Sequence, residues 1–205
     1  VSGNGSNRNF QVWDPETGTV LHKLTKGDWK QGATNAVFSP DGKWLAAANG
    51  DNERKVGLWD AKTYELKEII DLDAEQHSQS RIQFIGSPPQ LTMWPKRWNE
   101  ETRKWEALSK EPCLYSPDGT LACLSQRLYR IPDAEIKNLT KVLADEKLAG
   151  ALAHFNQWSW SPDSKYFMST LTNGRLVLFN RKGELVRVLP GHQAEVRQTE
   201  FAPDG

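Results

Sequence analysis

Phe38-Ser39-Pro40-Asp41-Gly42, followed by the apolar run at positions 43–48, is the stretch of sequence that decides the fold. Proline presets φ for the first central position of a β-turn, aspartate bonds nearby backbone N–H groups, and glycine tolerates positive φ. The aromatic residue before the turn ends one strand, and the apolar run after it begins the next. The stretch therefore predicts a β-hairpin.

Near copies of this turn recur along the chain, at residues 115–119, 160–164 and 201–205. The aromatic residues that open the copies stand at positions 38, 115, 160 and 201, so the intervals are 77, 45 and 41 residues. The first interval is nearly twice the other two. It predicts a further unit with a degenerate turn, and Phe84-Ile85-Gly86-Ser87-Pro88-Pro89 lies near its middle.

A second motif keeps the same period as the first. Alternating apolar and polar residues run into a turn at residues 10–18, 56–63 and 176–183, and each copy is followed by a short strand-like run at 20–24, 66–70 or 185–189. With the hairpins, each unit is predicted to have four short strands. No sustained helical periodicity accompanies them, which indicates an all-β chain.

A unit of about 40 residues with four strands is typical of a β-propeller blade. The chain resembles the WD-repeat (WD40-type) β-propeller family in its Trp-Asp pairs at 13–14 and 59–60, its Pro-Asp-Gly turns and its Gly191-His192 pair. The resemblance implies a non-catalytic propeller of four-stranded antiparallel blades. It assigns structural repeat roles to Trp13, Asp14, Trp59, Asp60, Asp41, Asp118, Asp163 and Asp204.

The chain is interpreted as one partial propeller domain over residues 1–205, with about five blades' worth of sequence. The expected blades are residues 1–24 (half, the third and fourth strands), 34–72, 81–110, 113–143, 155–189 and 194–205 (the start of a blade). Either a composite blade from the two termini closes the ring, or the chain is a piece of a longer ring, which we expect. A helix-like stretch, Asp145–Leu152, is expected to form a single turn or a loop between blades.

Charge and motif content exclude several classes of function. The 26 basic and 26 acidic side chains give zero formal net charge, which makes nucleic acid an unfavoured partner. No apolar run is long enough for a membrane-spanning helix, no signal-peptide pattern is visible, and cytoplasm is the default expectation. Catalytic signatures and metal-binding spacings of His and Cys are absent from the sequence, so no enzyme activity, metal or cofactor is expected.

In propellers of this family, the top face consists of the loops that lead into each first strand and the loops that join the second and third strands. Binding residues concentrate on such loops. The candidate binding residues are Trp29, Lys30, Asp51, Arg54, Trp98, His154, Asn173, His192 and Glu195. Several have alternatives. Trp29 either binds a partner or folds over a blade edge, and Trp98 either joins a basic aromatic binding cluster with Trp94 and Trp105 or pairs across a hairpin. The resemblance implies a structural, blade-ordering role for His192, for which His154 could substitute in the fifth blade.

The sequence favours a protein–protein interaction scaffold that binds proteins or peptides through its top-face loops. Ser-Pro-Asp-Gly turns also occur in propellers attached to peptidases. The alternative is therefore a propeller that regulates or gates an enzyme domain, a peptidase or a signalling kinase, outside this chain. The Trp-Asp pairs and Gly191-His192 favour the first hypothesis.

Overall fold

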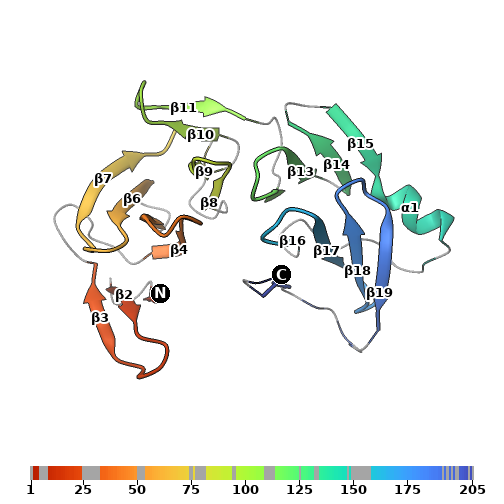
Figure 1. The fold of residues 1–205 in the computed structure, drawn as a ribbon, viewed down its shortest axis with the longest axis horizontal. Coiled ribbons are helices and arrows are strands. Elements are labelled where there is room, and N and C mark those ends of the chain that lie inside the picture. The colour runs from red at the N-terminus through yellow and green to blue at the C-terminus, as the bar shows by residue number, and fades with distance from the viewer. Residues whose placement is uncertain are drawn as a thin grey trace. The chain divides into compact units, whose positions relative to one another are not determined.

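The structure is a computed structural model of the 205-residue chain (Figure 1). It describes residues 2–4, 9–24, 33–49, 54–73, 76, 82–93, 96–108, 114–124, 126–131, 134–146, 148, 158–190, 192, 194, 196, 199–202 and 204. The chain divides into two compact units. Unit 1 comprises Val1–Phe84 and Pro88–Ala107, and unit 2 comprises Ile85–Ser87 and Leu108–Gly205.

The described strands form five antiparallel sheets, each consecutive in sequence. The first sheet has three strands, β1 (Ser2–Asn4), β2 (Asn9–Trp13) and β3 (Val20–Lys23). The other sheets have four: β4 (Ala33–Phe38), β5 (Trp44–Asn49), β6 (Lys55–Asp60) and β7 (Leu66–Asp71); β8 (Ile82–Ile85), β9 (Gln90–Met93), β10 (Lys96–Asn99) and β11 (Lys104–Ala107); β12 (Leu114–Tyr115), β13 (Leu121–Leu124), β14 (Arg127–Arg130) and β15 (Ala134–Asn138); β16 (Ser159–Trp160), β17 (Tyr166–Thr170), β18 (Leu176–Asn180) and β19 (Leu185–Leu189). The predicted all-β fold of four-stranded antiparallel blades is confirmed.

The first sheet differs from the expectation of two strands. Ser2–Asn4 pairs with β2 in the register Ser2↔Gln11 to Asn4↔Asn9, so this sheet has three described strands rather than two. The long interval between positions 38 and 115 contains the predicted extra blade, β8–β11. Its degenerate turn lies at residues 86–89, where Gly86 has a φ of 81°.

The recurring turn is held by its serine and aspartate. In each described copy, the Ser Oγ donates to the Asp Oδ1: Ser39 to Asp41 at 2.6 Å, Ser116 to Asp118 at 2.6 Å and Ser161 to Asp163 at 2.7 Å. The same Oγ accepts the backbone N–H five residues later, as Ser39 does from Trp44 at 2.9 Å. One side chain thus closes both sides of the hairpin.

A second turn follows the third strand of most sheets. Asp14 Oδ1 accepts backbone N–H groups of Glu16 and Thr17, and Asp60 Oδ1 accepts those of Lys62 and Thr63. These backbone bonds hold the pKa of both aspartates below the usual value. The equivalent acceptors in the third and fifth sheets are Asn99 and Asn180, so neutral amides form the same Asx turn there.

The aromatic residue before this turn packs against the preceding sheet. Trp59 is 2% exposed and lies 5.5 Å from Phe10 of the first sheet, measured between ring centroids. Trp98 packs in one cluster with Ile70 and other second-sheet residues. Trp13 is 39% exposed, because no described sheet precedes it in unit 1. Its Trp-Asp pair therefore supplies the turn but not a buried core residue.

The described helix and the described part of the C-terminal segment lie beside or within two predicted stretches that are partly outside the described residues. The described helix α1 is Leu139–Asp145, capped by Asn138 Oδ1, which accepts the N–H of Lys141 at 3.1 Å. It ends where the helix-like stretch Asp145–Leu152 was expected to begin, because Leu139 and Leu143 bury one face of the earlier segment. Residues 199–202 form no strand, although Thr199 bonds Ser159 on β16 at 3.1 Å.

Candidate functional site

Arg54 ties two top-face loops of unit 1 together. It lies in the connection between β5 and β6, with a φ of 50°. Its Nη2 donates to the backbone oxygens of Asp73 and Gln76 in the segment that leads into β8, the latter at 3.0 Å, and its own backbone oxygen accepts the N–H of Leu72. The guanidinium group therefore binds backbone oxygens of the neighbouring loop.

Gln76 extends this link to the next connection. Its side chain is fully buried, its Oε1 accepts the N–H of Asp73 at 3.1 Å, and its Nε2 donates to the backbone oxygen of Met93 at 2.8 Å. Lys96, just beyond Met93, pairs with Asp73 at 2.8 Å. Three top-face connections, at residues 54, 73–76 and 93–96, are therefore cross-linked into one support, which we call the loop clamp. Sequence reasoning missed Gln76, because a lone glutamine carries no motif.

A corresponding pair of top-face segments meets in unit 2. A Cβ added to Gly174, in the turn between β17 and β18, would lie 2.8 Å from the backbone oxygen of His192 and 2.5 Å from that of Ala194. The structure therefore brings the predicted residues Asn173 and His192 to neighbouring segments, and both side chains are exposed. Asn173 Oδ1 accepts the N–H of Arg175, which closes the turn.

The remaining predicted residues divide into two groups. Trp29, Lys30, Asp51, His154 and Glu195 lie outside the described residues. Trp98 lies in β10 and is 9% exposed. It stands opposite Trp105 in the register of the β10–β11 hairpin, with ring centroids 5.4 Å apart, so these two rings pair across the strands. Trp94, the third member of that cluster, is not among the described residues.

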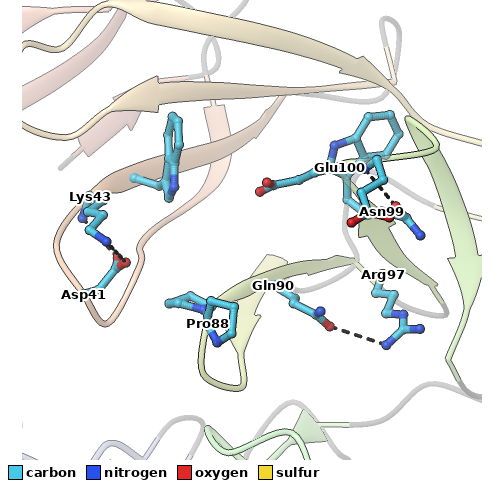
Figure 2. Close-up of a pocket in the computed structure, with 11 residues that line it drawn as sticks. Asp41, Lys43, Pro88, Gln90, Arg97, Asn99 and Glu100 are labelled. Carbon is cyan, nitrogen blue, oxygen red and sulfur yellow. Dashed lines mark hydrogen bonds and ion pairs between the residues drawn. The ribbon is translucent and has the colours of Figure 1, made fainter.

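The opposite end of unit 1 holds a pocket of about 480 Å³ (Figure 2). Three turns line it: residues 41–44 from the second sheet, and 88–90 and 97–101 from the third. Asp41 and Lys43 stand on one side, Pro88 and Gln90 form another wall, and Arg97, Asn99 and Glu100 face them (Figure 2). We call it the bottom-face pocket, because the first-to-second and third-to-fourth turns of a blade lie opposite its top-face loops.

Charges in the bottom-face pocket are unevenly compensated. Lys43 pairs with Asp41 at 3.5 Å, and Arg97 pairs with Glu106 at 3.3 Å and Gln90 Oε1 at 3.4 Å. Glu100 and Glu101 are exposed and have no cationic partner among the described side chains. Trp98 also lines the pocket, and its Nε1 has no hydrogen-bond partner within the described part of the chain.

Metal-binding groups and membrane-spanning helices were both absent from the described ranges. There, no group of three or more His, Cys, Asp and Glu side chains is placed to hold a metal ion. No helix in those ranges has the length and apolarity needed to cross a membrane.

The repeated four-stranded sheets, the Ser-x-Asp turns and the Asx turns define the chain as a β-propeller protein. Residues 18–60 match the family model described as "WD domain, G-beta repeat". This match spans 43 of the 205 residues and, together with the four-stranded sheets, supports the WD-repeat propeller that the sequence pattern predicted. The search of curated proteins gave no match. Propellers of this family are generally non-catalytic scaffolds that bind other proteins.

Proposed function

We propose that this chain is a non-catalytic interaction scaffold that binds partner proteins through its top-face loops. The observation that carries the proposal is the loop clamp, in which Arg54, Gln76 and Lys96 join three successive connections. A preorganised surface loses less conformational entropy on binding than separate mobile loops do. Loops held on a rigid sheet are also where recognition residues concentrate in folded proteins.

The neighbouring segments in unit 2 support the same role. Asn173 and His192 are exposed on two top-face segments whose backbones approach closely at Gly174. Exposed polar side chains on a fixed turn offer hydrogen bonds to a partner at little entropic cost. The untested candidates Trp29, Lys30, Asp51, His154 and Glu195 belong to loops of the same face in this proposal.

The proposal is tested by affinity capture with the complete 205-residue chain as bait. We expect proteins held by the wild type to be lost with Trp29→Ala/Arg54→Ala and with Asn173→Ala/His192→Ala. A matched control, Lys62→Ala/Lys182→Ala, changes two exposed residues of third-to-fourth turns and should retain them. Retention by both loop variants, with native circular dichroism, would show that the top-face assignment is wrong.

A further inference from the structure

The bottom-face pocket of unit 1 has features of a binding site that the top-face proposal does not use. Its volume of about 480 Å³ falls within the range of about 300–1,000 Å³ that is usual for small-ligand sites. Its walls come from turns fixed by side chains: Ser39 and Asp41 close one, and Asn99 closes another through the N–H groups of Glu101 and Thr102. The cavity is therefore preformed.

The lining leaves negative charge uncompensated. Each cation of the lining has its own anion, since Lys43 faces Asp41 and Arg97 faces Glu106. Glu106 also accepts a hydrogen bond from Asn99 Nδ2 at 2.6 Å, so its carboxylate is held by both Asn99 and Arg97 of β10. Glu100 and Glu101 then remain as the two carboxylates of the lining without a cation among the described residues.

Glu100 also repels Glu68, a carboxylate outside the pocket lining. The pKa of Glu68 is raised above its usual value, mainly by burial and partly by repulsion from Glu100, while Arg103 opposes the shift. Arg103 is paired with Glu68. A cation that enters the pocket would relieve this repulsion, whereas an anion would add to it.

The apolar part of the lining suits a planar cation. Trp44, Pro88 and Pro89 line the same pocket as the carboxylates. A guanidinium stacks on aromatic faces and bonds carboxylates through a planar fork, which an ammonium does not do.

We propose that the bottom-face pocket binds an arginine side chain of a partner peptide, held by the carboxylates of Glu100 and Glu101 over the surface of Trp44 and Pro88. The occupant is a basic peptide segment, selected by charge complementarity. This site is separate from the top-face surface, because its turns lie at the other end of the same two sheets.

The experiment titrates the complete chain with an acetylated and amidated peptide of sequence Ala-Ala-Arg-Ala-Ala and follows peptide resonances by NMR. The arginine peptide should bind the wild type, and its affinity should fall about fivefold to tenfold in Glu100→Gln/Glu101→Gln, as expected for the loss of two partly exposed ion pairs. Matched peptides with glutamine or glutamate in place of arginine should bind more weakly. Glu16→Gln, an exposed residue of the first sheet, serves as the control variant and should bind as the wild type does.

The proposal would be overturned if the arginine peptide did not bind at millimolar concentration, or if it bound the double variant as tightly as the wild type. Preference for the glutamate peptide would also overturn it, because that result would place an anionic ligand on Lys43 and Arg97. Arg54→Ala should leave the titration unchanged. Failure of this site therefore remains distinguishable from failure of the top-face proposal. The variants replace exposed side chains, so an unchanged thermal midpoint is expected and is measured alongside.

Discussion

Arg181 of the β18–β19 turn donates from Nη1 to Oδ2 of Asp118 at 2.9 Å, although 63 residues separate them in the chain. Its Nη2 donates to Thr120 Oγ1 at 2.9 Å, and the backbone N–H of Asp118 donates to Ser164 Oγ at 3.0 Å. The recurring turns of two successive sheets in unit 2 are therefore bonded to each other. Ser164, with a φ of 60°, stands where other copies have glycine and supplies the acceptor.

Replacing Arg181 should weaken this link. We expect Arg181→Gln to lower the free energy of unfolding by about 1 kcal/mol, since both ionic partners are more than a third exposed and water screens the pair. Urea denaturation measures the change. Arg175→Gln, an exposed arginine of the same sheet, is the matched control and should stay within about 0.5 kcal/mol of the wild type. Equal losses in the two variants would contradict the link.

The serine of the recurring turn lowers the pKa of the aspartate in the same turn. The pKa of Asp163 is lowered to about 2, first by the hydrogen bond from Ser161 and then by Lys165. A carboxyl with a lowered folded pKa stabilises the fold above its unfolded pKa near 3.8, and this contribution is lost as the pH falls towards 2. In Ser161→Ala, the pKa of Asp163 should rise towards 3.8. The free energy of unfolding of this variant should therefore decrease less than that of the wild type as the pH falls towards 2.

NMR titration of the side-chain carboxyl carbons measures this shift. The pKa of Asp60, which backbone N–H groups of Thr63 and Lys62 lower, should stay where it is in the same variant. Ser161→Ala should also lower the free energy of unfolding by about 1–3 kcal/mol at neutral pH, because the N–H of Tyr166 loses its acceptor. An unchanged Asp163 titration would mean that the turn does not depend on serine.

Gly57 makes room for the buried indole of the Trp-Asp pair. A Cβ at this position would lie 2.2 Å from Cη2 of Trp59. Gly57→Ala should therefore cost about 3 kcal/mol, because Trp59 is buried and cannot move without disturbing its neighbours. Gly42→Ala meets no atom within 4 Å but has a φ of 68°, so its cost should be about 1 kcal/mol. Thermal unfolding of the two variants gives the order, and a reversed order would contradict this packing.

Gln76 offers a direct test of the loop clamp. Gln76→Ala removes the acceptor of the Asp73 N–H and the donor to Met93, and it should cost about 2 kcal/mol. Faster amide hydrogen exchange should follow at residues 72–73 and 93. Gln90, an exposed glutamine of β9, provides the control. Gln90→Ala should leave exchange at those positions unchanged. Unchanged exchange in Gln76→Ala would show that the clamp does not order the loops.

Much of the fold could be predicted from the sequence because local turn chemistry repeats. The Ser-x-Asp and Trp-Asp motifs each act within a few residues, so their spacing was enough to predict repeated four-stranded antiparallel sheets. The third sheet was harder, because asparagine replaces aspartate there. Trp98-Asn99 stands 39 residues after Trp59-Asp60, and this interval was the available signal for its third strand.

The site was less predictable because its residues act over long sequence separations. Gln76 bonds Met93 across 17 residues, and no motif marks either of them. Helix α1 was not predicted, since its start depends on Asn138 as a cap and on burial of Leu139 in the core of unit 2. Most of the predicted helix-like stretch, Asp145–Leu152, lies outside the described residues. Five candidate binding residues lie outside the described ranges and remain predictions: Trp29, Lys30, Asp51, His154 and Glu195.

The most direct test of the scaffold proposal is amide hydrogen exchange on the complete chain, free and bound to a protein captured by it. The account predicts protection on binding at the top-face connections, around residues 54, 72–76, 171–174 and 192–196. It also predicts that the recurring turns at 39–43, 116–120 and 161–165 keep the exchange rates of the free chain. Protection confined to those turns, with the top-face connections unchanged, would contradict it.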